Sequence, residues 1–295
     1  MKIQRRSRRG YSVPSAFWQT SRVERFCVLG ETVSAIVGQG RLRPVVFLHG
    51  NSSVKVVWAN QLEAVHRQGH SFLAPDLPGH GESEDSALAE RTYSLPGYSA
   101  VISRLLDALR WDCVDVVGWS LGGHIGLQLL ATDRRIRSLL IVGTPPVAVG
   151  AKSLREAFYE SAEMNLAGKA KFGPEDAWAY GSAMMGGREH LPAELLGWIR
   201  RTDGAARAHL FASALRGVGV DQKELVETVD KPLCVVHGEM EPFVRLDYLY
   251  SLRYRALWED RIFVIANAGH APHWQRPSLF NSILLKFLIG AKSNR

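Results

Sequence analysis

The chain has 295 residues, of which 46% are hydrophobic and 22% charged, so it is long and apolar enough to bury a sizeable globular core. It contains no run of about 18 uninterrupted apolar residues, which argues against a membrane span. The net charge of +7 is concentrated in residues 1–25, where seven Lys and Arg residues stand against one Glu. Because the remainder is nearly neutral, we expect a basic flexible tail and neither nucleic acid nor a membrane as a partner.

The patterns of arginines and cysteines favour neither an export signal nor a metal site. The double arginine at residues 8–9 is not followed by an apolar core, so we expect a cytoplasmic location. Cys27, Cys113 and Cys234 lie far apart in apolar surroundings without a CxxC spacing, which predicts reduced core thiols. Since a dense cluster such as HxHxDH is also absent, we expect no metal and no cofactor.

From residue 26 onward, apolar strands alternate with helices. Residues 25–40 have the pattern of a hairpin of two short strands. Continuous apolar runs predict further strands within 43–50, 71–83, 113–120, 136–146, 231–242 and 261–270. Helical patterns lie between several of them, at 58–68, 97–110, directly after 120 and at 277–289. This alternation predicts an α/β fold with a mainly parallel sheet that is covered by helices on both faces.

Between Thr144 and Arg216 the alternation gives way to helical patterns alone. Four segments are predicted, at 153–168, 174–185, 192–201 and 204–216, and Ser153 with Glu156 has the spacing of a capping box. We expect residues 144–216 to form a helical cap over the strand ends. The core domain would then comprise residues 26–143 and 217–295.

Ser120 stands where the strand within 113–120 changes to a helix. Gly118-Trp-Ser-Leu-Gly122 fits G-x-S-x-G, the turn in which small flanking residues allow the backbone to bend sharply and raise a nucleophilic serine. The strand before it and the helix after it are the context that this motif requires. The alternative interpretation is a serine that caps an ordinary helix.

A serine nucleophile needs a base, and the base needs an acid. His270 follows the last predicted strand and is the favoured base; His273 is the alternative, while His49 is expected to shape its own loop. Among the acids after the penultimate strand, Glu241 has the better position, just before a proline. Glu239 and Asp247 remain alternatives.

Acyl transfer also requires donors aimed at the developing oxyanion. We expect one to be the backbone N–H of Leu121, immediately after the serine. The second is expected in the loop after the strand at 43–50, at Asn51, whose side chain is a further candidate for binding a substrate oxygen. A simple turn-forming asparagine is the alternative.

The motifs FLHGN, PDLPGHGES, GWSLGG, HGEMEPFV and NAGHAP together resemble the α/β-hydrolase superfamily over nearly all of the chain beyond residue 25. HGNSS, GTPPV, RTDG and EPFV further resemble the AidH-type serine N-acyl-homoserine lactonases. This resemblance implies Ser120 as nucleophile, His270 as base and Glu241, a glutamate in place of the usual aspartate, as acid. It also implies that Asn51 lies in the oxyanion loop and that Tyr180, in the cap, contacts the lactone.

The implied reaction is opening of the lactone ring of a small acyl substrate through an acyl-enzyme, without a metal. Carboxylester or carbon–carbon bond hydrolysis on the same scaffold is the alternative, and a ligand receptor that retains the triad is a third possibility. Dehalogenase and epoxide-hydrolase chemistry is disfavoured, because it needs an aspartate in place of Ser120. Apolar cap residues that are candidates for an acyl pocket, or for plain core, are Phe158, Trp178, Met184, Met185, Trp198 and Phe211.

Overall fold

The computed structural model describes residues 21–291 except 188 and 190. Its centre is an eight-stranded sheet with the order β1-β2-β4-β3-β5-β6-β7-β8. The strands are β1 Ser21–Val28, β2 Glu31–Gly38, β3 Leu42–Leu48, β4 His70–Pro75, β5 Val114–Trp119, β6 Ile136–Val142, β7 Leu233–Gly238 and β8 Leu257–Ile265. The first two strands form the predicted hairpin, β2 pairs antiparallel with β4, and all remaining neighbours are parallel.

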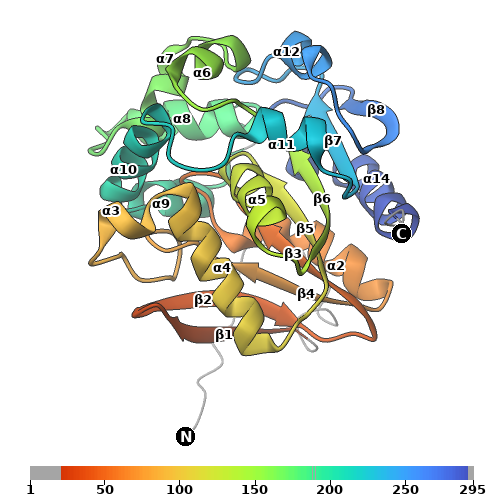
Figure 1. Ribbon diagram of the computed structural model, residues 1–295. Helices are drawn as coiled ribbons and strands as arrows, with labels where there is room; N and C mark the ends of the chain where they lie inside the picture. The colour runs from red at the N-terminus through yellow and green to blue at the C-terminus, as the bar shows by residue number, and fades with distance from the viewer. Residues whose placement is uncertain (1–20, 188, 190, 292–295) are drawn as a thin grey trace, which may run out of the picture.

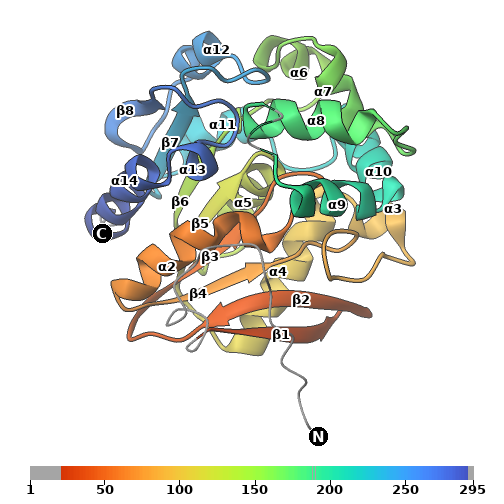
Figure 2. The same ribbon diagram turned by 180° about the vertical axis from the view of Figure 1, so that it is seen from behind.

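Helices cover both faces of the sheet, as the alternating pattern predicts. On one face lie α4 (Leu95–Leu109), α5 (Leu121–Thr132) and α11 (Gln222–Thr228) (Figure 1). The other face carries α2 (Ala59–Arg67), α13 (Pro272–Gln275) and α14 (Pro277–Gly290) (Figure 2). The remaining short elements are η1 Lys55–Trp58, α3 Ala89–Thr92 and α12 Leu246–Ser251. Every residue of β5 is buried, as expected for a central strand covered from both sides.

A helical insertion between β6 and β7 gathers at one end of the sheet (Figure 1). It consists of α6 Ala151–Ala157, α7 Ala162–Asn165, η2 Leu166–Gly168, α8 Asp176–Met185, α9 Ala193–Arg201 and α10 Gly204–Leu215. It occupies the segment expected as a cap, residues 144–216. Its treatment as a domain of its own remains a proposal.

The prediction of one helix at 153–168 is wrong, because this stretch contains the end of α6, a break at Phe158, α7 and η2. The chain leaves α6 at Phe158, which forms a β-bridge with Val244, and the Tyr159 N–H donates to the Phe243 carbonyl at 2.8 Å. The predicted capping box is also wrong, because α6 begins at Ala151 and Ser153 lies buried inside it. Pairing with a distant loop therefore outweighs the local helical preference.

Two further expectations need correction. Residues 21–25 belong to β1, because they pair in register with β2 from Ser21 opposite Gly38 onward; the rest of the expected tail, residues 1–20, lies outside the described part. Cys234 is buried as expected, but Cys27 and Cys113 are exposed. Cys27 lies on a half-exposed strand at the edge of the sheet, and Cys113 lies in the turn before β5.

No helix among the described residues is long and apolar enough to cross a bilayer. The cytoplasmic location stays a prediction.

Candidate active site

Ser120 lies in a strained turn between β5 and α5. Its backbone has φ 52° and ψ −117°, in the left-handed half of the Ramachandran plot that non-glycine residues rarely occupy. The flanking glycines are required by close backbone approach: a Cβ on Gly118 would lie 2.4 Å from the Gly122 carbonyl oxygen, and one on Gly122 would lie 2.1 Å from that of Leu48. The motif therefore has the strand–turn–helix geometry that the sequence predicts.

His270 follows β8 and is held by contacts on several sides. Its Nδ1 lies 2.8 Å and 2.9 Å from the two carboxylate oxygens of Glu241. The Trp119 indole N–H donates to the His270 carbonyl at 2.8 Å, and the Phe243 ring packs edge-on against the imidazole with centroids 4.9 Å apart. These contacts set the ring orientation and leave Nε2 as the nitrogen available to a hydroxyl.

Glu241, in the loop after β7, is the acid that the fold brings to His270. Its carboxylate accepts a backbone hydrogen bond from Phe243 N–H at 2.9 Å. Burial acts to raise the pKa of Glu241, but the charge and hydrogen bond of His270 and the Phe243 N–H outweigh burial and lower it. By contrast, Asp247 forms a surface ion pair with Arg245, and the Glu239 carboxylate accepts from Asn267 N–H.

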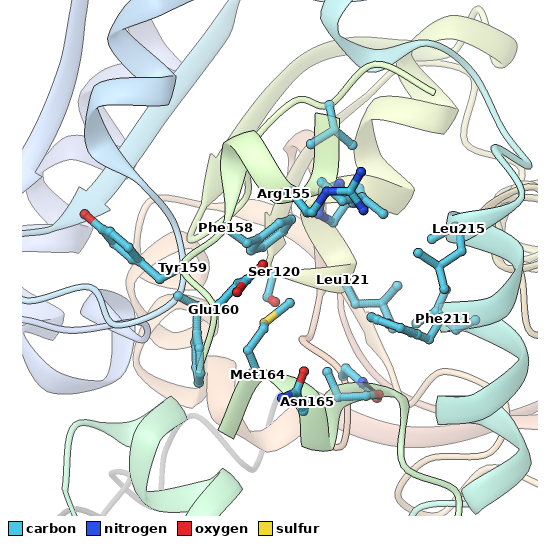
Figure 3. Close-up of a pocket in the computed structure, with 18 of the residues that line it drawn as sticks. Ser120, Leu121, Arg155, Phe158, Tyr159, Glu160, Met164, Asn165, Phe211 and Leu215 are labelled. Carbon is cyan, nitrogen blue, oxygen red and sulfur yellow. Dashed lines mark hydrogen bonds between the residues drawn. The ribbon is translucent and has the colours of Figure 1, made fainter. Parts of the chain in front are cut away.

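A cavity of about 520 Å³ opens between the elbow and the helical insertion (Figure 3). The predicted site residues among those that line it are Asn51, Ser120, Leu121, Tyr180 and His270. The insertion contributes an apolar wall, whose largest members are Leu154, Phe158, Met164, Leu210, Phe211 and Leu215. Of the six apolar cap candidates, Phe158 and Phe211 therefore line this cavity, whereas Met184 and Met185 are buried elsewhere in the insertion.

Asn51 uses its side chain to bind the insertion. Its Nδ2 donates to the carbonyl of Ala167 in η2 at 2.9 Å, and a hydrogen bond also links it to the buried Tyr180 hydroxyl. The backbone N–H groups of Asn51 and Leu121 donate to no acceptor in the part of the chain that is described. Both residues line the cavity, as expected for residues of an oxyanion hole.

The other candidate histidines, His49 and His273, are buried in the core and make contacts that do not involve Ser120. His49 bonds the Gly50 carbonyl through Nδ1 at 2.8 Å and accepts from Leu77 N–H through Nε2 at 2.9 Å, so it shapes its own loop as expected. His273 is fully buried, with its ring centroid 4.2 Å from that of Trp58.

His124 is a cavity residue that the sequence analysis missed. It lies one helical turn after Ser120, and its Nδ1 is 2.8 Å from the Gln222 amide oxygen. The spacing of four residues from the serine was the available signal, because residues four apart share a helix face.

Three histidines with lowered pKa values, His49 and His80 in the core and the partly buried His124 beside the cavity, predict loss of stability in acid. Burial, the largest cause, lowers the pKa of His49 to about 4, of His80 to about 3 and of His124 to about 4, from an ordinary value of 6.5. Between pH 6.5 and 4 the unfolded chain therefore binds more protons than the folded one. The free energy of unfolding should fall with pH by about 1.4 kcal/mol per unit for each histidine.

Urea unfolding between pH 7.5 and 4.5 measures this slope. The variant His124→Gln should reduce the slope of the unfolding free energy against pH by about 1.4 kcal/mol per unit, the contribution of one histidine. A stability that stays constant between pH 6.5 and 4.5 would contradict burial of these groups in the neutral form.

The comparisons with known proteins show the family of this chain. A family model described as alpha/beta hydrolase fold matches residues 43–277, and the chain belongs to this family. It is a hydrolase of the α/β-hydrolase fold. No group of three or more His, Cys, Asp or Glu side chains within the described ranges is arranged to hold a metal ion.

Particular relatives differ in what they act on. A solved structure of the N-acyl homoserine lactonase AidH is 35% identical, with a TM-score of 0.88 over 94% of this chain and 99% of that one. AidH structures have been solved with N-butanoyl homoserine and with N-hexanoyl homoserine lactone. The pimeloyl-[acyl-carrier protein] methyl ester esterase of Nitrosomonas europaea is 26% identical, covering 81% of this chain and 92% of that protein. The 2-hydroxy-6-oxononadienedioate/2-hydroxy-6-oxononatrienedioate hydrolase of Cupriavidus pinatubonensis is also 26% identical, covering 83% and 86%.

Proposed function

We propose that this protein opens the lactone ring of N-acyl-homoserine lactones through an acyl-enzyme. The observation that carries the proposal is the buried His270–Glu241 pair, 2.8 Å apart, beside a largely apolar cavity that Ser120 also lines. An apolar cavity with a few convergent polar groups suits a small acyl substrate. The 35% identity to the lactonase AidH supports this substrate class.

In the proposed mechanism, His270 Nε2 removes the proton from Ser120, whose Oγ attacks the lactone carbonyl carbon. Glu241 keeps the proton on His270 Nδ1 and stabilises the imidazolium. The ring oxygen leaves, protonated by His270, and the homoserine hydroxyl remains attached through its own chain. Water activated by His270 then hydrolyses the acyl-enzyme and releases the N-acyl-homoserine.

The oxyanion of both tetrahedral intermediates is assigned to the N–H groups of Asn51 and Leu121. One such donor contributes about 3–4 kcal/mol to transition-state stabilisation in other enzymes. Tyr180, whose hydroxyl meets Asn51, is assigned to the lactone head. The apolar wall of the insertion, including Phe158 and Phe211, is assigned to the acyl chain.

Incubation with N-hexanoyl homoserine lactone near neutral pH, followed by mass spectrometry, tests the proposal. The expected product is the substrate plus one water with the acyl chain retained, and acidification should reverse the change. EDTA should leave the rate unchanged, since no step uses a metal. Release of free hexanoic acid would indicate an acylase instead, and loss of activity with EDTA would contradict the serine mechanism.

Carboxylester hydrolysis is the second candidate, because the same groups perform it and the Nitrosomonas europaea relative is a methyl ester esterase. Turnover of p-nitrophenyl butyrate with no turnover of the lactone would favour it. In that case the catalytic assignments stand and only the substrate class changes.

A further inference from the structure

Arg207, in α10 of the insertion, is a buried cation that forms no ion pair within 4 Å in the described part of the chain, although the Asp203 carboxylate acts on it from farther away. Only 3% of it is exposed, and burial lowers the pKa of its guanidinium. The charge is instead satisfied by backbone carbonyls: Nε donates to Lys169 at 2.8 Å and Nη2 to Ala170 at 3.1 Å. The Phe172 ring lies 4.0 Å from its central carbon. Because burying a charge is costly, these contacts indicate a specific role.

A further contact of Arg207 crosses from the insertion to the loop after β3. Its Nη1 lies 3.4 Å from the Ser52 hydroxyl, which donates in turn to the Asn51 side-chain oxygen at 3.4 Å. Ser52 has φ 55°, so the Asn51–Ser52 turn is strained and needs outside support. The other end of the Asn51 amide is bound to the Ala167 carbonyl. The turn is thus held by the insertion from two sides.

We propose that Arg207 is a positioning residue, which holds the Asn51–Ser52 turn so that the Asn51 N–H points at the oxyanion. This inference rests on the proposed function, because it takes Asn51 as an oxyanion donor. Arg207 itself does not line the cavity and touches no reacting atom. Through this contact, the rate of the reaction would depend on how the helical insertion packs against the Asn51–Ser52 turn.

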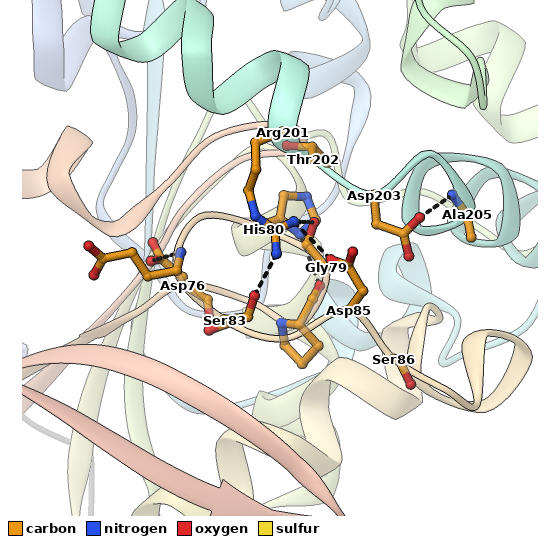
Figure 4. Close-up of polar contacts among 12 residues, drawn as sticks. Asp76, Gly79, His80, Ser83, Asp85, Ser86, Arg201, Thr202, Asp203 and Ala205 are labelled. Carbon is orange, nitrogen blue, oxygen red and sulfur yellow. Dashed lines mark hydrogen bonds and ion pairs between the residues drawn. The ribbon is translucent and has the colours of Figure 1, made fainter.

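The same corner of the insertion supplies a second arginine as a control. Arg201, six residues before Arg207, donates to the Ser83 carbonyl and pairs with Asp85, both at 2.8 Å, and the Asp203 N–H donates to the Gly79 carbonyl at 2.8 Å (Figure 4). These contacts join the α9–α10 corner to the loop after β4. None of them involves the Asn51–Ser52 turn, so Arg201 attaches the insertion without orienting the oxyanion loop.

The test compares Arg207→Met with Arg201→Met. Arg207→Met should lower kcat by about 10²-fold, the effect expected when a reacting group is misplaced by about 1 Å. KM should stay within about threefold, since a transition-state contact is lost and ground-state binding is not. Arg201→Met should keep kcat within about twofold, although it removes the contacts of a partly exposed arginine that joins the insertion to the loop after β4. Circular dichroism checks that both variants are folded.

A second readout separates failure of this inference from failure of the proposed function. The rate at which a fluorophosphonate modifies Ser120, followed by intact mass, depends on the oxyanion donors and needs no lactone. A wild type that is not labelled contradicts the proposed function. A labelled wild type with Arg207→Met modified equally fast overturns the role of Arg207, as does an equal loss of kcat in Arg201→Met.

Ser52→Ala keeps the test decisive if Arg207→Met does not fold. It breaks the link between Arg207 and Asn51 while leaving the carbonyl contacts of the guanidinium intact. We expect a lower kcat at unchanged KM and no further loss when the change is combined with Arg207→Lys. A Ser52→Ala variant with the wild-type kcat and labelling rate would overturn the proposal.

Discussion

Replacing Ser120 with alanine should lower kcat for N-hexanoyl homoserine lactone by about 10⁶-fold, the size of effect that loss of a triad serine has elsewhere. The Ser120 hydroxyl is the nucleophile in the proposed mechanism. A water molecule in its place is not held in position by a covalent bond and cannot form the acyl-enzyme. The fold should be retained, because the substitution removes one oxygen at the cavity wall and keeps the Cβ. Kinetic assays with thermal unfolding measure both effects.

Ser120→Gly serves as the matched control for the elbow. It should be as inactive as Ser120→Ala, but its free energy of unfolding should rise by about 1 kcal/mol, since glycine adopts φ 52° without a steric penalty. Turnover retained in both variants would contradict the assignment of the nucleophile.

Glu241→Gln should lower kcat by on the order of 10³–10⁴-fold, because the amide no longer stabilises the imidazolium and favours the wrong tautomer of His270. The change is nearly isosteric, and the Phe243 N–H can still donate to the remaining carbonyl oxygen. The loss should therefore appear in kcat with little change in KM. Rates measured at saturating lactone check this prediction.

Asp247→Asn and Glu239→Gln are the controls for the acid. Asp247 is paired with Arg245 at the surface, and Glu239 binds the Asn267 N–H, so both variants should keep kcat within about twofold. A large loss in Asp247→Asn together with a normal rate in Glu241→Gln would show that a different carboxylate supports His270.

The motif around Ser120 was predictable because its cause is local. The turn requires small residues at 118 and 122, and the buried strand before it favours β-branched residues. Both requirements are therefore visible in adjacent residues of the sequence. The parallel sheet was equally accessible, since continuous apolar strands between helices have few other ways to bury both faces. The breaks within the insertion were missed, because Phe158 pairs with Val244, a residue far along the chain.

The acid and the supports of the oxyanion loop were decided by contacts between distant residues. Three carboxylates follow β7 within nine positions; the place of Glu241 before a proline favoured it, but local pattern left Glu239 and Asp247 as alternatives. Asn51 and Ala167 are 116 positions apart, and Arg207 and Ser52 are 155 apart. Arg207 carries no sequence signal of burial, because most of its hydrogen bonds go to backbone carbonyls, which every residue possesses, and its side-chain contact Ser52 is distant in sequence.

The fold class, the elbow and the candidate base could be predicted from neighbouring residues, because sterics and hydrophobic period act over short stretches of chain. The choice of Glu241 over the other two carboxylates, the hydrogen bond from Asn51 to the insertion and the exposure of Cys27 and Cys113 became visible in the folded chain. These outcomes depend on how separate elements pack, and packing is set by the complementary shapes of whole surfaces rather than by any short stretch of chain.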